Sequence, residues 1–80
     1  MEQGVNQELD AQGLICPLPL LKAKQALNRM VANEVLKVLA TDAGSVRDFK
    51  VFCDQSGHEL LSAEEEAGVY IYYLRKRDID

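Results

Sequence analysis

Apolar residues in the first part of the chain recur at helical spacing and predict a helix over residues 17–30. The residues that define the spacing are Leu20, Ala23, Leu27 and Met30. Residues separated by three or four positions share one face of an α-helix. A short strand over residues 8–12 is expected before this helix, with Gly13 supplying the turn between the two.

A nearly continuous apolar run follows and predicts an interior strand over residues 34–41. It reads Val35-Leu36-Lys37-Val38-Leu39-Ala40. Such runs are typical of strands that are covered on both faces. A strand, a helix and a strand in this order imply a right-handed parallel crossover. The carboxyl ends of both strands, and the residues that follow them, are therefore expected at one edge of the sheet.

A second helix is expected between Ser45 and Gly57. Ser45 is the predicted N-cap, and Asp48 stands where the acid of a capping box would be. The predicted core face of this helix consists of Val46, Phe49 and Cys53, with Phe52 alongside. Gly57 ends the helix in the left-handed conformation that glycine accommodates. Cys53 is therefore expected to be a buried core residue, too remote from the sheet edge to pair with another cysteine.

Two further strands are expected over residues 58–65 and 69–77, joined by a hairpin at Gly68. Both faces of the last strand are apolar or aromatic. One face carries Val69, Ile71 and Tyr73, and the other carries Tyr70, Tyr72 and Leu74. One of the two sets is expected to be half exposed. The predicted fold is of the α+β class. It is a two-layer α/β sandwich in the order β-α-β-α-β-β, with a mixed four-stranded sheet and both helices on one face.

The composition is that of an ordinary globular domain. The 80 residues are 48% hydrophobic and 28% charged, with a net charge of −4. This length suits one domain over residues 1–80, with residues 1–7 frayed. No apolar run reaches the ~18 residues of a membrane span, and no leader pattern is present, so a cytoplasmic protein is expected. The sequence does not determine the oligomeric state, and a monomer is the expectation. The acidic balance argues against direct nucleic-acid binding.

Positive charges nevertheless gather in two places. One group is Lys22, Lys24 and Arg29 in the first helix, and the other is Arg75-Lys76-Arg77 at the end of the last strand. A solvated helix face and a solvated strand end explain both groups. The alternative is a docking surface for an acidic protein partner.

Cys16 is the candidate for chemistry, because it lies where the first helix begins. Either Cys16 caps the helix and Pro17 opens it, or Leu18 caps it and Pro19 opens it. The helix dipole is expected to lower the thiol pKa modestly from about 8.5. The alternative is that Cys16 only fills space, as most free cysteines do. Asp42 follows the second strand, and it is either a turn residue or orients the loop beside Cys16.

No metal or cofactor is expected. Two cysteines far apart and a single histidine supply no recognisable zinc spacing. His58 is expected to be a strand-start residue and not a base for Cys16. Without a general base, a nucleotide loop or a metal cluster, a self-sufficient enzyme is not expected.

Several motifs together resemble the signature of the TusA/SirA-like family of small sulfur carriers, over residues 8–77. They are Leu9-Asp10-Ala11, Gly13-Leu14, Cys16-Pro17-x-Pro19, Ala40-Thr41-Asp42, Asp48, Phe52-Cys53 and Gly57-His58-Glu59-Leu60. The resemblance implies that Cys16 accepts sulfur as a persulfide from a donor such as a cysteine desulfurase. It further implies relay to a thiol-bearing acceptor protein, in the best-known branch on the way to 2-thiouridine in tRNA. That branch has a glutamate between the two prolines, where this chain has Leu18.

Two functional hypotheses follow. In the first, the protein is a sulfur-relay carrier, with Gly13, Pro17, Pro19 and Asp42 supporting Cys16. Its partners would dock on a surface comprising Leu18, Leu21, Lys22, Lys24 and Arg29. In the second, the protein is a non-catalytic regulatory or interaction module, and the cysteine–proline stretch is a structural helix cap.

Overall fold

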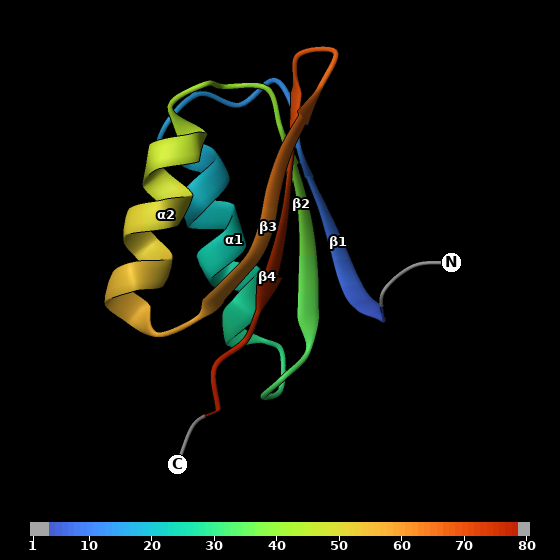
Figure 1. Ribbon diagram of the computed structural model, residues 1–80, viewed down its shortest axis with the longest axis vertical. Helices are drawn as coiled ribbons and strands as arrows, with labels where there is room; N and C mark the ends of the chain where they lie inside the picture. The colour runs from blue at the N-terminus through green and yellow to red at the C-terminus, as the bar shows by residue number, and fades with distance from the viewer. Residues whose placement is uncertain (1–3, 79–80) are drawn as a thin grey trace.

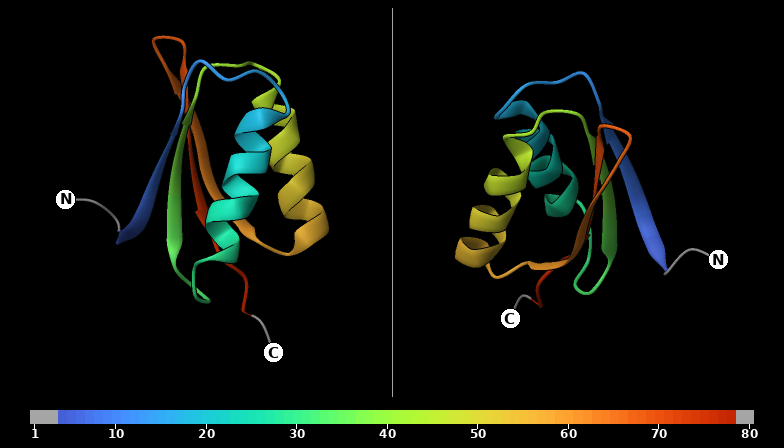
Figure 2. Two further views of the ribbon diagram at one scale, coloured as in Figure 1. Left: turned by 180° about the vertical axis from the view of Figure 1, so that it is seen from behind. Right: turned by 45° about the horizontal axis from the view of Figure 1, so that its top comes forward.

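The computed structural model describes residues 4–78 and has two layers, a sheet and a pair of helices (Figure 1). The elements in chain order are β1 (Val5–Ala11), α1 (Leu18–Asn28), β2 (Val35–Ala40), α2 (Ser45–Ser56), β3 (Glu59–Glu66) and β4 (Val69–Arg75). The strands lie in the order β1-β2-β4-β3. β1 runs parallel to β2, whereas β4 is antiparallel to both β2 and β3. Both helices cover the same face of the sheet (Figure 2), so the predicted α+β sandwich is confirmed.

The core lies between the helices and the sheet. It is formed by fully or almost fully buried side chains, including Ala23, Leu27, Leu36, Val38, Phe49, Tyr72 and Leu74. The rings of Phe49 in α2 and Tyr72 in β4 stack with their centroids 4.5 Å apart. Such an aromatic pair contributes about 0.5–1.5 kcal/mol beyond the area that it buries. This stack attaches α2 to the middle of the sheet.

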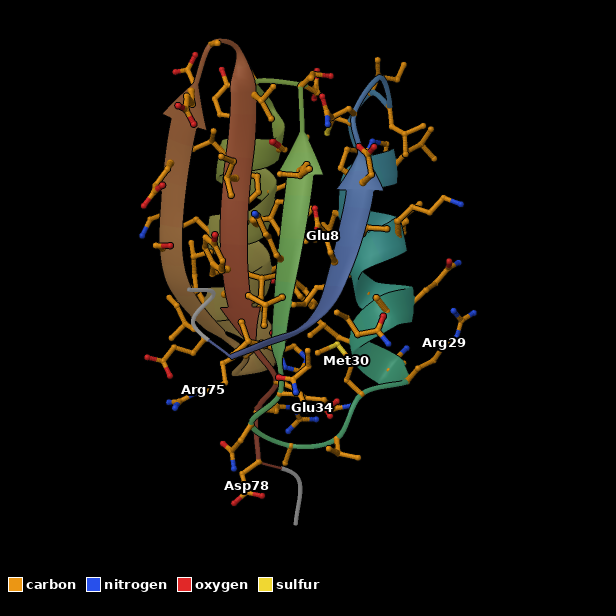
Figure 3. All side chains as sticks on the ribbon, turned by 90° about the vertical axis from the view of Figure 1, so that its right-hand side faces the viewer. Glu8, Arg29, Met30, Glu34, Arg75 and Asp78 are labelled. Carbon is orange, nitrogen blue, oxygen red and sulfur yellow. The ribbon has the colours of Figure 1, made fainter. Side chains whose placement is uncertain are left out.

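The last strand has the two unequal faces that its sequence predicts. Tyr72 and Leu74 point into the core and are buried. Val69, Ile71 and Tyr73 are half-buried on the opposite face. That face carries no helix, as the view onto the sheet shows (Figure 3). None of the helices within residues 4–78 combines the length and the apolar content needed to cross a membrane.

β1 is longer than predicted, since it begins at Val5 and not at Glu8. Val5 is paired with Val35 of β2, and the Asn6 side chain accepts a hydrogen bond of 2.9 Å from the Val35 N–H. The prediction of a frayed segment is therefore wrong for residues 5–7, because pairing with β2 orders them. Residues 1–3 of that segment lie outside the described residues.

The start of α1 matches neither predicted register. Pro17 is the residue that precedes the helix, Leu18 is the first helical residue and Pro19 the second. A turn comes first, because the Leu18 N–H donates to the Ile15 carbonyl at 2.8 Å. Pro19 fits its place because the N–H groups of the first helical turn have no partner within the helix.

The buried face of α2 differs from the prediction at its first residue. Its buried residues are Ser45, Phe49 and Cys53, whereas Val46 is 44% exposed. Gly44 is the N-cap, so the prediction of Ser45 as a capping residue is wrong. The Ser45 hydroxyl lies inside the protein, 2.7 Å from both the Asp42 carbonyl oxygen and the Tyr72 hydroxyl. These hydrogen bonds hold Ser45, in place of Val46, against the sheet.

The basic residues at the end of the chain are not simply a solvated strand end. Lys76 is only 6% exposed, and its Nζ donates a 2.6 Å hydrogen bond to the Leu27 carbonyl in the last turn of α1. A cation there satisfies an unpaired carbonyl and complements the helix dipole. Arg75 is exposed and forms an ion pair with Glu59. Lys76 is therefore a structural residue and unsuited to docking.

Candidate functional site

The candidate site lies at the edge of the sheet where β1 and β2 end. The loop that precedes α1 and the loop that precedes α2 run side by side there (Figure 2). The Gly13 N–H donates to the Thr41 hydroxyl at 2.9 Å, and the Cys16 N–H donates to the Asp42 Oδ2 at 3.1 Å. The sequence predicted that Cys16 and Asp42 would share this edge, and the structure brings them together.

Two glycines shape these loops. Gly13 has a φ of +84°, in the left-handed region that glycine adopts without strain. Gly44 lies at a tight place between the loops: a Cβ on it would lie 3.0 Å from Asp42 Oδ2, so the Asp42 side chain would have to shift slightly, and 3.5 Å from Cys16 Cβ. The sequence analysis missed Gly44, because its role depends on the contact between the two loops.

The Cys16 thiol is exposed and is held by a residue of α2. Its Sγ donates a hydrogen bond to Asp48 Oδ2, and the two atoms are 2.6 Å apart. The peptide bond between Cys16 and Pro17 is cis. Asp48 was expected as a capping acid and as one of the residues that carry the family resemblance, but not as a partner of the thiol, so this contact is the main feature of the site that sequence reasoning missed. A usable signal existed, because Asp48 lies in the first turn of a helix that starts at the same edge of the sheet.

The electrostatic surroundings of Cys16 are the opposite of those predicted. The hydrogen bond to Asp48 raises the pKa of the Cys16 thiol above its ordinary value, and so do desolvation and the negative charges of Asp48 and Asp42. These effects favour the protonated form, because a hydrogen bond donated by the thiol and nearby negative charges both disfavour the thiolate. The expectation of a lowered pKa is therefore wrong.

Exposed apolar side chains lie close to the thiol in the chain. Leu18 is 41% exposed and Leu21 is 45% exposed, as expected of residues off the core face of α1. The structure adds Ile15, 69% exposed, and Val46, 44% exposed, which the sequence analysis did not propose. Ile15 directly precedes the cysteine, and Val46 is the second residue of α2. Both therefore belong to the same edge of the sheet.

The three basic residues of α1 do not form a single surface. Lys24 borders a groove of about 340 Å³ between the helices, which is lined by Leu20, Lys24, Arg47, Asp48, Val51, Phe52 and Gln55. The Lys24 Nζ lies 5.4 Å from the centre of the Phe52 ring, a cation–π contact. Lys22 and Arg29 border a different hollow, beside Glu8 of β1. Arg29 extends outward from the far end of α1 (Figure 3).

Asp48 links the groove to the thiol. It is one of the residues that line the groove, and its Oδ2 accepts the hydrogen bond of the Cys16 thiol. A partner that fills the groove beside Lys24 would therefore lie next to Asp48, the residue that holds the thiol.

Cys53 and His58 lie away from this edge. Cys53 is 7% exposed, and burial raises the pKa of its thiol to about 11, with a smaller contribution from Asp54. The prediction of a core cysteine is confirmed. His58 follows the C-terminal end of α2, and its Nδ1 accepts a 3.0 Å hydrogen bond from the Arg77 N–H. Within residues 4–78 no group of three or more histidine, cysteine, aspartate or glutamate side chains is arranged to hold a metal ion.

Comparison with known proteins gives a consistent result. The family model described as sulfurtransferase TusA matches residues 7–76. The chain is 52% identical over 71 residues to the sulfur carrier protein TusA of Allochromatium vinosum, covering 89% of this chain and 93% of that one. It is 54% identical over 72 residues to a putative sulfur carrier protein of Neisseria meningitidis serogroup A, covering 90% and 97%.

The fold has a counterpart among solved structures. The crystal structure of a SirA-like protein from Desulfitobacterium hafniense matches with a TM-score of 0.76 and 26% sequence identity. The match covers 90% of this chain and 99% of that chain.

Proposed function

The chain belongs to the TusA sulfurtransferase family, and from this premise we propose that it is a sulfur carrier that holds sulfur as a persulfide on Cys16. One observation carries the assignment to Cys16: its thiol is exposed at the sheet edge, whereas Cys53, the other cysteine, is buried in the core. Only an exposed sulfur can meet the sulfur of another protein.

The proposed loading step is an exchange between two cysteines. The Cys16 thiolate attacks the terminal sulfur of a persulfide on the donor protein. The bond between Cys16 Sγ and that sulfur forms, and the sulfur–sulfur bond of the donor breaks. The donor cysteine leaves as a thiolate and takes up the proton that Cys16 gave up. The products are a persulfide on Cys16 and a free thiol on the donor, with no net oxidation or reduction.

The supporting residues fix the path of the backbone at the thiol. Gly13 supplies the left-handed turn, and Asp42 holds the Cys16 N–H. Pro17 and Pro19 restrict the backbone on the other side of the thiol. In this proposal, none of the four reacts with sulfur. They hold Cys16 at the tip of the loop.

The proposed carrier is a single cytoplasmic domain of residues 1–80. Its proposed partners are a donor of the cysteine desulfurase type and a thiol-bearing acceptor protein, which it binds one after the other. The proposed docking residues are Leu18, Leu21, Lys22, Lys24 and Arg29. Because Lys24 borders one hollow and Lys22 and Arg29 another, donor and acceptor have two separate basic contacts available. The branch that leads to 2-thiouridine has an acid at the position of Leu18, whereas Leu18 presents an apolar contact. Because of this difference, the proposal includes both tRNA thiolation and another sulfur-trafficking pathway as end points.

The geometry gives little support to the alternative of a purely structural helix cap. The N-terminus of α1 has no side-chain hydrogen bond from a capping residue. The Cys16 thiol is directed to Asp48 of α2 instead.

The test is intact mass spectrometry after incubation with a cysteine desulfurase and free cysteine. The wild-type protein and a Cys53→Ala variant should each gain one sulfur atom, because both retain the exposed thiol. Cys16→Ser should gain none while keeping the far-ultraviolet circular dichroism spectrum of the wild type. Sulfur uptake by folded Cys16→Ser, or no uptake by the wild-type protein, would contradict the proposal.

A further inference from the structure

Two carboxylates, those of Asp48 and Asp42, lie beside Cys16. Asp48 accepts the hydrogen bond of the thiol, and Asp42 accepts that of the Cys16 backbone N–H. In the part of the chain that the structure describes, neither carboxylate forms an ion pair with lysine or arginine. Asp48 is partly buried and lines an open groove together with Lys24 and Arg47, where another protein can approach it.

This arrangement conflicts with the chemistry that the site has to perform. The thiolate, and not the thiol, is the nucleophile that attacks sulfur. A thiol that donates a hydrogen bond to one carboxylate and lies near a second one keeps its proton at neutral pH. The isolated carrier is therefore in a resting state, and loading requires a change at the carboxylates.

We propose that Asp48 holds the Cys16 thiol in this resting state, and that a basic side chain of the docked sulfur donor takes over the carboxylate and releases the thiol. The inference rests on the proposed function, since it concerns how the same cysteine is loaded. It also defines the donor surface: an arginine or lysine near the donor persulfide, framed by apolar side chains that meet Ile15, Leu18 and Val46.

Release by a cation has two effects on the thiol. The carboxylate turns to the stronger, charge-assisted hydrogen bond offered by the donor, so the thiol loses its acceptor. The positive charge then favours the thiolate, which attacks the donor persulfide as described above. Away from a donor, the same contact protects the carrier, because oxidants attack a protonated thiol much less readily than a thiolate.

The first test measures the pH dependence of Cys16 alkylation by iodoacetamide, a neutral reagent, with site-resolved mass spectrometry. The variant Asp48→Asn removes the charge, and Asp54→Asn is the matched control, because Asp54 is an exposed aspartate on the same helix. The profile of Asp48→Asn should move to lower pH, whereas that of Asp54→Asn should follow the wild type. Below both pKa values, each unit of this shift raises the thiolate fraction about tenfold, and the alkylation rate rises by less, because a thiolate of lower pKa is a weaker nucleophile.

Sulfur loading by a desulfurase should change in the opposite direction. Asp48→Asn should load several-fold more slowly although its thiol is more reactive, because the basic group of the donor has lost its partner. A merely structural role of Asp48 predicts that alkylation and loading fall together, and that result would overturn the inference. An alkylation profile identical to that of the wild type would overturn it too.

A second measurement needs no change to the carrier. The ¹³Cβ chemical shift of Cys16 distinguishes thiol from thiolate in wild-type protein labelled at cysteine. At pH 7.5 it should report a thiol in the free carrier and a shift toward thiolate in the complex with a desulfurase whose catalytic cysteine is replaced by alanine. A thiol signal in both states would overturn the inference.

The failures are distinguishable. If the wild-type protein takes up no sulfur from an active desulfurase, the proposed function fails. If the wild type loads and Asp48→Asn behaves like the wild type, only the inference about Asp48 fails.

Discussion

The two cysteines of this chain have raised thiol pKa values for different physical reasons. At Cys53 the cause is burial in the core between α2 and the sheet. At Cys16 the principal cause is a hydrogen bond to Asp48 on an open surface. Burial can be undone only by opening the fold, whereas a surface carboxylate can be neutralised by a partner. The comparison shows how one small domain contains both a permanently inert thiol and a conditionally reactive one.

The largest expected effect concerns the labelling of the two thiols. In native protein, iodoacetamide at pH 8 should modify Cys16 at least about a hundredfold faster than Cys53, because Cys53 reacts only after the core opens. In about 6 M guanidinium chloride, which unfolds the protein, the two rates should agree within about threefold, because unfolded cysteines have similar pKa values. Peptide mass spectrometry of time points measures both rates. Equal rates in the native protein would remove the basis of the comparison.

The second effect is on stability. Cys53→Ser should lower the free energy of unfolding by about 1–3 kcal/mol, because a hydroxyl is then buried in an apolar site without a designed partner. Cys16→Ser should change it by less than about 0.5 kcal/mol, since the site is exposed and the hydroxyl can still donate to Asp48. Urea unfolding followed by circular dichroism gives both values. A larger loss for Cys16→Ser would show that the thiol has a packing role.

How much of this could be predicted from the sequence depends on the range of each contact. The helices, the interior strand and the burial of Phe49 and Cys53 follow from local spacing, and they were predicted. The approach of Cys16 and Asp42 follows from a general rule about the ends of parallel strands. These features require no knowledge of how one helix is rotated against another.

The features that were missed depend on how the elements pack against one another. The buried stripe of α2 passes through Ser45 and leaves Val46 exposed, although Phe49 and Cys53 are buried as predicted. Asp48 reaches the thiol of Cys16, 32 residues earlier in the chain. The contact of Lys76 with the Leu27 carbonyl spans 49 residues and likewise follows only from the packed structure. Local propensity carries no information about contacts at these separations.

The smallest expected effect is a loss of stability in alkali that depends on Cys53. The folded-state pKa of about 11 is above the ordinary value of 9.0 for a cysteine, so the folded protein keeps a proton that the unfolded chain loses. This contribution is fully present below pH 9 and is lost as the pH rises toward 11. Urea unfolding between pH 8 and pH 10.5 should show a smaller decline for Cys53→Ala than for the wild type. Parallel declines would contradict burial as the cause.

The central claim is that sulfur resides on Cys16 and not on Cys53, and locating it by peptide mass spectrometry tests this most directly. The wild-type protein is loaded by a desulfurase, its persulfide is blocked with iodoacetamide, and the chain is then digested. One additional sulfur atom is expected on the peptide that contains Cys16 and none on the peptide that contains Cys53. Additional sulfur on the Cys53 peptide, or on neither peptide, would contradict it.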